Sequence, residues 1–231
     1  MKHIFLDRCE STQSSFKEYW AQHSGHTSQL LVSTQEQTGG IGRRGNSWFS
    51  NSHSLSMSFS FKSQSILSLT PLHIAVALCE FFHLKNIPLK LKWPNDILDH
   101  NGNKLGGILC QVIDQETVLV GVGLNLYLDE QDKQAMENIP YEVGHLNLKN
   151  IDKKVLAEDL YKSLLGQNDF QFENWNKFCH HIDKVVTIVD GEQKVEGIFV
   201  GIDKDGAALV KSNDKTHRVL TGSLRVSSRL G

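Results

Sequence analysis

The feature that most constrains the fold is residues 54–61, SLSMSFSF, where small polar and large apolar residues alternate without a break. Successive side chains of a β-strand point to opposite faces, so a period of two predicts a strand. Its large residues would enter a core. The serine face is small enough to leave room for a helix or a ligand, although a solvated face is the more common explanation. The chain must therefore build a sheet around this strand.

Further strands are predicted on both sides of this one, with helices between them. Apolar or alternating runs predict strands at 4–6, 29–33, 89–93, 104–109 and 118–126. Helical spacing of apolar residues predicts helices ending near 22 and 86, one capped by Asp152, and one over roughly 170–179. Thr70 followed by Pro71 is a typical N-cap and first helical residue. Residues 129–150 predict loops or a short helix.

The residue pattern changes at residue 184, where short runs of alternating apolar and polar residues begin. Asp190-Gly191 and Asp205-Gly206 separate these runs, and Asp-Gly is a strong β-hairpin signal. We therefore expect two domains, a mixed α/β domain over 1–183 and a small β-barrel over 184–231.

Composition narrows the class of protein. The 231 residues carry a formal net charge of -2, which argues against extensive nucleic-acid binding. The four cysteines are widely spaced and include no CxxC pair, so they predict free thiols in a reducing compartment. No run approaches the roughly 18 apolar residues that span a bilayer. We expect a soluble, cytoplasmic protein that binds neither DNA nor a membrane.

Residues 35–48, QEQTGGIGRRGNSW, form the most distinctive polar segment. Glycine lets a ligand approach backbone N–H groups, and Arg43 and Arg44 offer donors that suit carboxylate and phosphate oxygens. Trp48 offers a flat face for a ring. The segment predicts an anion-binding loop, with a mobile surface turn as the alternative.

Other polar residues also have a functional and a structural interpretation. The Ser11-Thr12-Gln13 cluster is either a helix cap or a set of donors for a polar ligand. Asn95 and Asp96 are turn residues, although Asp96 at a strand end could also hold Mg²⁺. Asn125 interrupts an apolar strand, so its buried amide needs a protein or ligand partner.

Three separated segments agree on a family: EQTGGIGRRGNSW, LKWPNDIL with KLGGIL, and VGVGLNL. With EST, GIDKDGAALV and SLR, they resemble biotin protein ligases over residues 4–226. The resemblance implies an α+β fold, with a mixed sheet and helices like those of class II aminoacyl-tRNA synthetases and a small C-terminal SH3-like barrel. It also implies that biotin and MgATP give biotinyl-5'-AMP, from which biotin passes to a lysine of biotin carboxyl carrier protein.

The resemblance assigns roles to individual residues. Lys104 and Arg43 would be catalytic, because both would hold the anions that react. Asp96 would engage the Mg²⁺ of the nucleotide. The biotin-binding residues implied are Ser11, Thr12, Gln13, Gln37, Gly40, Gly42, Arg43, Lys104 and Gly107. The residues implied for ATP and the adenylate are Arg43, Arg44, Gly45, Trp48, Asn95, Asp96, Asn125, Lys204 and Arg225.

The chain departs from the family pattern at two positions. Ile41 stands where the loop usually carries a basic residue, and the family usually has an acidic residue near Thr221. Family members that repress transcription carry a winged-helix domain before the catalytic one, whereas this sequence starts at the catalytic domain. We therefore expect a monofunctional ligase, either monomeric or homodimeric.

Two other functions are alternatives to biotin ligation. A lipoate ligase or octanoyltransferase shares the fold. The GRRG loop together with KWPND is the biotin version of the site and argues against this alternative. A non-catalytic nucleotide- or RNA-binding module of the same fold would bind ligand without forming AMP.

Overall fold

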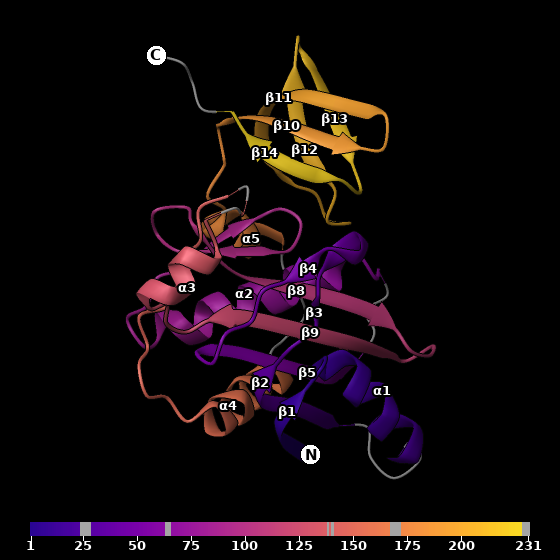
Figure 1. The fold of residues 1–231 in the computed structure, drawn as a ribbon. Coiled ribbons are helices and arrows are strands. Elements are labelled where there is room, and N and C mark those ends of the chain that lie inside the picture. The colour runs from indigo at the N-terminus through magenta and orange to yellow at the C-terminus, as the bar shows by residue number, and fades with distance from the viewer. Residues whose placement is uncertain (24–28, 63–65, 138, 140, 167–171, 228–231) are drawn as a thin grey trace.

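The computed structural model describes residues 1–23, 29–62, 66–137, 139, 141–166 and 172–227. Within these, seven strands form one mixed sheet in the order β1-β2-β5-β9-β8-β7-β6 (Figure 1). β1 and β2 are parallel and the other neighbours are antiparallel. The strands are β1 (Lys2–Cys9), β2 (Leu30–Gln37), β5 (Ser54–Lys62), β6 (Lys90–Lys92), β7 (Asp96–Leu98), β8 (Lys104–Val112) and β9 (Thr117–Asn125). The expected α+β class is confirmed.

β5 lies inside the sheet, between β2 and β9, and is covered on both faces. Leu55, Met57 and Phe59 are buried in the main core. The serines of the other face are buried as well, so the solvated alternative is wrong for this strand. α1 (Thr12–His23) covers part of this face, where Ser58 donates to the Thr12 hydroxyl at 2.9 Å.

The helices divide between the two faces of the sheet. α2 (Leu69–His83), α4 (Lys153–Leu165) and α5 (Phe172–Phe178) pack on the face of the main core, while α1 covers a smaller cluster around Phe16 and Leu119. The short α3 (Glu130–Ala135) lies in the segment expected to be loops or a short helix. Asp152 caps α4 as expected, accepting from the Val155 N–H at 3.0 Å. The predicted start of the last helix, Phe170, lies outside the described residues.

The prediction that Thr70 caps α2 is wrong. α2 already begins at Leu69, and Thr70 is a buried residue of its first turn. Pro71 still fits there, because the N–H groups of a first turn have no acceptor within the helix.

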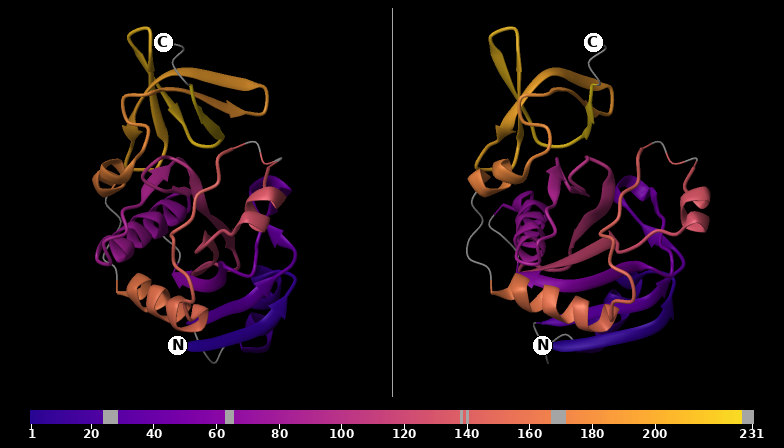
Figure 2. Two further views of the ribbon diagram at one scale, coloured as in Figure 1. Left: turned by 60° about the vertical axis from the view of Figure 1, so that its left-hand side comes forward. Right: turned by 90° about the vertical axis from the view of Figure 1, so that its left-hand side faces the viewer.

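The last part of the chain is a five-stranded antiparallel sheet, in the order β13-β12-β11-β10-β14. Its strands are β10 (Val185–Asp190), β11 (Gln193–Ile202), β12 (Ala208–Ser212), β13 (Lys215–Val219) and β14 (Ser223–Val226). The two Asp-Gly pairs mark the turns of this sheet, as expected: Asp190 ends β10 with Gly191 after it, and Asp205-Gly206 lies between β11 and β12. This sheet sits at one end of the molecule, beside α5 (Figure 2). No helix of the described part of the chain is long and apolar enough to cross a membrane.

Candidate active site beneath the glycine-arginine loop

A pocket of about 1330 Å³ opens beneath the segment that follows β2. That segment folds as β3 (Gly40–Ile41), a 3-10 turn over Arg43–Gly45, and β4 (Ser47–Trp48). β6 to β9 supply other walls, and residues 223–225 of the C-terminal sheet complete the lining. The predicted site residues that line it are Ser11, Thr12, Gln13, Gln37, Gly40, Gly42, Arg43, Trp48, Asn95, Asp96, Lys104, Gly107 and Arg225.

One end of the pocket is a fixed network of neutral polar groups. The side-chain carbonyl of Gln37 accepts from the Thr12 backbone N–H at 2.9 Å and from the Thr12 hydroxyl at 3.2 Å. The Gln37 amide nitrogen is 3.2 Å from the Ser50 hydroxyl. Gln13 donates to the Leu109 carbonyl at 3.0 Å. Gln37 of β2 thus caps the start of α1, and this end of the pocket suits an uncharged polar group with several donors and acceptors.

Trp48 forms a flat wall because β9 has a glycine beneath it. A Cβ on Gly123 would lie 2.7 Å from the Trp48 ring, so only glycine allows the indole to lie so close to the strand. The indole Nε1 is buried and has no hydrogen-bond partner within the described residues. A Cβ on Gly123 would also lie 2.8 Å from this nitrogen, so the N–H edge of the ring faces β9.

The other end of the pocket is charged. The Lys104 ammonium lies 2.7 Å from Asp96 Oδ1, and the Lys92 ammonium lies 3.3 Å from Asp96 Oδ2. Arg43 donates to the Asn95 side-chain carbonyl at 3.2 Å and to the backbone carbonyl of Gly222 at 3.4 Å. Burial, and then repulsion from Arg44, lowers the pKa of Arg43, although a guanidinium keeps its proton in proteins. Three cations therefore surround Asp96 and Asn95, where an anionic ligand would find donors.

Four predicted residues do not line this pocket. Arg44 points to the C-terminal sheet and pairs with Asp190 at 2.7 Å. Gly45 is exposed on the outer side of the loop. Asn125 is buried behind the pocket and donates to the Gly144 carbonyl at 3.1 Å, while its own carbonyl has no partner in the described chain. Lys204 is exposed in the turn between β11 and β12, whose Gly206 packs on α2.

The two departures from the family pattern have different settings. Ile41 lines the pocket and is 52% exposed, so an apolar side chain stands at its rim. Thr221 lies outside the lining and its hydroxyl donates to Asp190. A carboxylate is thus present beside Thr221, supplied by the neighbouring strand β10.

Sequence reasoning missed Lys92, which stands in the LKWPND segment but was given no role. Its alternation with Leu91 and Trp93 already predicted that it faces away from the core. It also missed Asp190, which counted only as a turn residue. No sequence signal links Asp190 to Arg44, because they are far apart in the chain.

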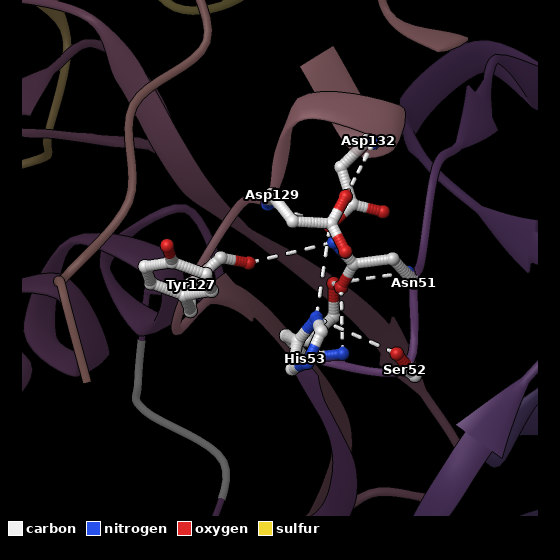
Figure 3. Close-up of polar contacts among 7 residues, drawn as sticks. Asn51, Ser52, His53, Tyr127, Asp129 and Asp132 are labelled. Carbon is white, nitrogen blue, oxygen red and sulfur yellow. Dashed lines mark hydrogen bonds and ion pairs between the residues drawn. The ribbon is translucent and has the colours of Figure 1, made fainter. Parts of the chain in front are cut away.

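A second group of potential ligands, His53, Asp129 and Asp132, lies outside the pocket lining (Figure 3). The two aspartates have a structural role, because each side chain accepts from the backbone N–H of the other and so caps α3. His53 lies 3.6 Å from Asp132. Helix capping accounts for the placement of both carboxylates.

The fold and the pocket define an α+β protein whose glycine-arginine loop covers a pocket with a neutral polar end and a charged end. Residues 5–125, more than half of the chain, match the model of the biotin/lipoate A/B protein ligase family. The chain belongs to this family. Residues 181–223 match the biotin protein ligase C-terminal domain.

Individual relatives agree with the family match. The bifunctional ligase/repressor BirA of Escherichia coli is 27% identical over 77% of this chain, which spans 60% of that protein's length. The biotin–[acetyl-CoA-carboxylase] ligase of Paracoccus denitrificans is 27% identical over 87% of this chain and 91% of that protein. The structure resembles the biotin protein ligase from Aquifex aeolicus in complex with biotin and ATP, with a TM-score of 0.76 and 25% identity, over 98% of this chain and 99% of that one.

Proposed function

We propose that this protein is an ATP-dependent biotin ligase. It would join biotin and ATP to biotinyl-5'-AMP and pyrophosphate, and then transfer the biotinyl group to a lysine of a biotin carboxyl carrier protein. One observation carries the proposal: segments far apart in the chain place Arg43, Lys104 and Trp48 around one pocket that also has a neutral polar end. The names of the Paracoccus and Aquifex relatives support the same activity.

The proposed binding mode follows the polarity of the pocket. The neutral end, built by Thr12, Gln13 and Gln37, suits the ureido ring of biotin, which has both donors and acceptors. The biotin carboxylate would then reach the charged end. The adenine would lie along the Trp48 indole, which lines the pocket.

In the first half-reaction, a carboxylate oxygen of biotin attacks the α-phosphorus of ATP, and pyrophosphate leaves. Two anions must approach each other, so fixed cations supply most of the help. Lys104 would exchange its bond to Asp96 for one to the biotin carboxylate. Arg43, oriented by Asn95 and Gly222, would bind the α-phosphate and stabilise the charge that develops on it.

In the second half-reaction, the uncharged amine of the carrier lysine attacks the biotinyl carbonyl carbon, and AMP leaves. The carbonyl oxygen gains negative charge as the amine adds. Lys104 would stabilise this charge, because it already binds that carboxyl group. No side-chain nucleophile of the protein is needed.

Asp96 would engage the Mg²⁺ of the nucleotide. Mg²⁺ is usually held by one or two carboxylates together with substrate phosphates, and Asp96 lines the charged end of the pocket. Both of its oxygens lie beside lysine ammonium groups, so these must shift when the ion arrives with ATP. The ion would neutralise phosphate charge.

We further propose a cytoplasmic location and the carrier domain of acetyl-CoA carboxylase as the partner, following the name of the Paracoccus relative. The division into domains 1–183 and 184–231 is proposed on the two separate sheets and on the separate match of residues 181–223.

ATP–pyrophosphate exchange tests the proposal. The protein is incubated with ATP, labelled pyrophosphate and either biotin, lipoate or octanoate. We expect exchange with biotin and not with lipoate or octanoate. When a carrier domain is added, biotin should be transferred to it. Exchange with lipoate but not biotin would assign the chain to the lipoate branch of the family, and ligand binding without exchange would indicate a non-catalytic module.

A further inference from the structure

Asp190 joins the glycine-arginine loop to the C-terminal sheet. It ends β10, and both of its carboxylate oxygens are used. Oδ1 accepts from Arg44 Nη2 at 2.7 Å, while Oδ2 accepts from the Thr221 hydroxyl. Thr221 therefore fixes the carboxylate in the orientation that receives Arg44.

A second contact between the same two parts of the chain lies one residue further on. The Gly222 carbonyl accepts from Arg43 Nη1 at 3.4 Å. Gly222 has φ +143, and a Cβ there would lie 2.7 Å from the Ile188 side chain, so glycine is required to present this carbonyl. Thr221 and Gly222 thus hold both adjacent arginines, one through Asp190 and one directly.

The loop conformation separates the two arginines. Arg44 has φ 57, in the left-handed region that residues other than glycine, asparagine and aspartate seldom adopt. Arg43 points toward the pocket and Arg44 toward β10. The Asp190 charge also offsets the repulsion between the two guanidinium groups, which otherwise opposes their proximity.

We propose that Asp190 is a positioning residue for the adenylation site. Through Arg44 it fastens residues 40–48 to the C-terminal sheet, and so sets Arg43 over the pocket. Arg44 then acts in the fastening of the loop and not as a ligand of the nucleotide. This role rests on the proposed function, whereas the fastening itself does not.

Trypsin tests the fastening directly, because it cuts after Arg43 and Arg44. The rate of cutting at these bonds, identified by mass spectrometry in ligand-free protein, is compared for the wild type, Asp190→Asn and Glu196→Gln. Glu196 is the matched control: an exposed carboxylate of β11 that pairs with Lys194 at 3.0 Å, away from the pocket lining. We expect cutting of Asp190→Asn to be roughly threefold to fivefold faster, the scale of one exposed ion pair. Glu196→Gln should match the wild type.

Salt gives a second readout. Arg44 and Asp190 side chains are 48% and 42% exposed, so added salt screens their attraction. Cutting of the wild type should accelerate with sodium chloride and approach the rate of Asp190→Asn, which should change little. Equal rates for the wild type and Asp190→Asn at low salt would overturn the fastening.

Steady-state kinetics tests the positioning role. Asp190→Asn should raise KM for ATP by roughly threefold to fivefold, with a smaller change in kcat and in KM for biotin. The charge exchange Arg44→Asp with Asp190→Arg should recover most of the loss that each single variant shows, which general damage to the fold would not allow. Faster cutting with unchanged KM for ATP would overturn the positioning role. If the wild type forms no adenylate but cutting responds, the fastening stands, and the proposed function fails together with this role.

Discussion

The proposed chemistry of the pocket depends most on the contact between Lys104 and Asp96. Their charges lie 2.7 Å apart, with Lys92 on the other carboxylate oxygen. This arrangement keeps a cation oriented toward the place where an acid would bind, and Gly107 beneath it leaves that place open. In the proposed mechanism, the biotin carboxylate would replace the Asp96 carboxylate as the partner of Lys104 with no net loss of ion pairs.

Lys104→Gln should lower adenylate formation by at least ~10²-fold, the scale for losing one oriented donor that stabilises the transition state. The measurement is biotin-dependent ATP–pyrophosphate exchange. Lys133→Gln serves as the control, because Lys133 is an exposed lysine of α3 in a pair with Glu130. Turnover of Lys104→Gln near the wild-type rate would remove Lys104 from the catalytic role.

The buried ammonium of Lys153 predicts how the stability of the protein depends on pH. This ammonium donates to the Gln35 carbonyl at 2.6 Å, and burial lowers the pKa of Lys153 from 10.5 to about 8. Between these values the unfolded chain binds the proton and the folded chain does not, so stability rises with pH. Below pH 8 both states are charged and the cost of burial is fully present.

The free energy of unfolding, measured in urea from pH 7 to 10.5, should therefore rise relative to that of Lys153→Met above pH 8. The slope of the difference should approach about 1.4 kcal/mol per pH unit, the value for one proton. Parallel curves for the two proteins would mean that Lys153 stays charged when folded.

At the scale of elements, β9 supports both the neutral end of the pocket and the Trp48 wall through two glycines on one face. Gly121 lies under Gln13, where a Cβ would come within 2.6 Å of its amide nitrogen. Gly123 lies under Trp48. Strand periodicity places both residues on the pocket side, so one strand supports the neutral end and the ring wall together.

Alanine at these two positions should separate the substrates. Gly123→Ala displaces Trp48 and should raise KM for ATP by roughly tenfold, with a smaller effect on biotin. Gly121→Ala displaces Gln13 and should do the reverse. Each variant controls for the other, because both add one methyl group to the same strand. Equal effects on both substrates in both variants would contradict the proposed binding mode.

At the scale of the whole molecule, the two sheets share one hydrophobic core. Phe199 and Val186 of the C-terminal sheet belong to the same buried cluster as Leu78 and Trp93. The Trp93 indole also donates to the Gly206 carbonyl at 3.1 Å, which ties the large sheet to the turn between β11 and β12. The two proposed domains, which differ in residue pattern, should therefore unfold as one unit.

Phe199→Ala should lower the stability of the entire chain by roughly 3–5 kcal/mol, the cost of removing a buried phenylalanine. Hydrogen exchange of residues 30–37 and 54–62, which form β2 and β5, reports on the large sheet. Hydrogen exchange of residues 185–226 reports on the other. Both should shift together, and Val200→Ala, at a neighbouring exposed site, should shift neither. A shift confined to residues 185–226 would show two independent units.

The sequence by itself determined the local features. Alternation predicted β5, Asp152 predicted the start of α4, and the Asp-Gly pairs predicted two turns of the C-terminal sheet, because each depends on neighbours along the chain. Most of the site residues that the motifs predicted also line the pocket. Thr70 misled because several residues of a first helical turn can tolerate the Thr-Pro pair.

Only the tertiary structure decided which polar residues share a site. The serines of β5 are buried, Lys92 lies beside Asp96, and Arg44 pairs with Asp190 and does not line the pocket. These outcomes depend on contacts between residues distant in the chain. Periodicity and motif spacing record what lies next along the backbone, whereas an ion pair across 146 residues depends on how two sheets pack.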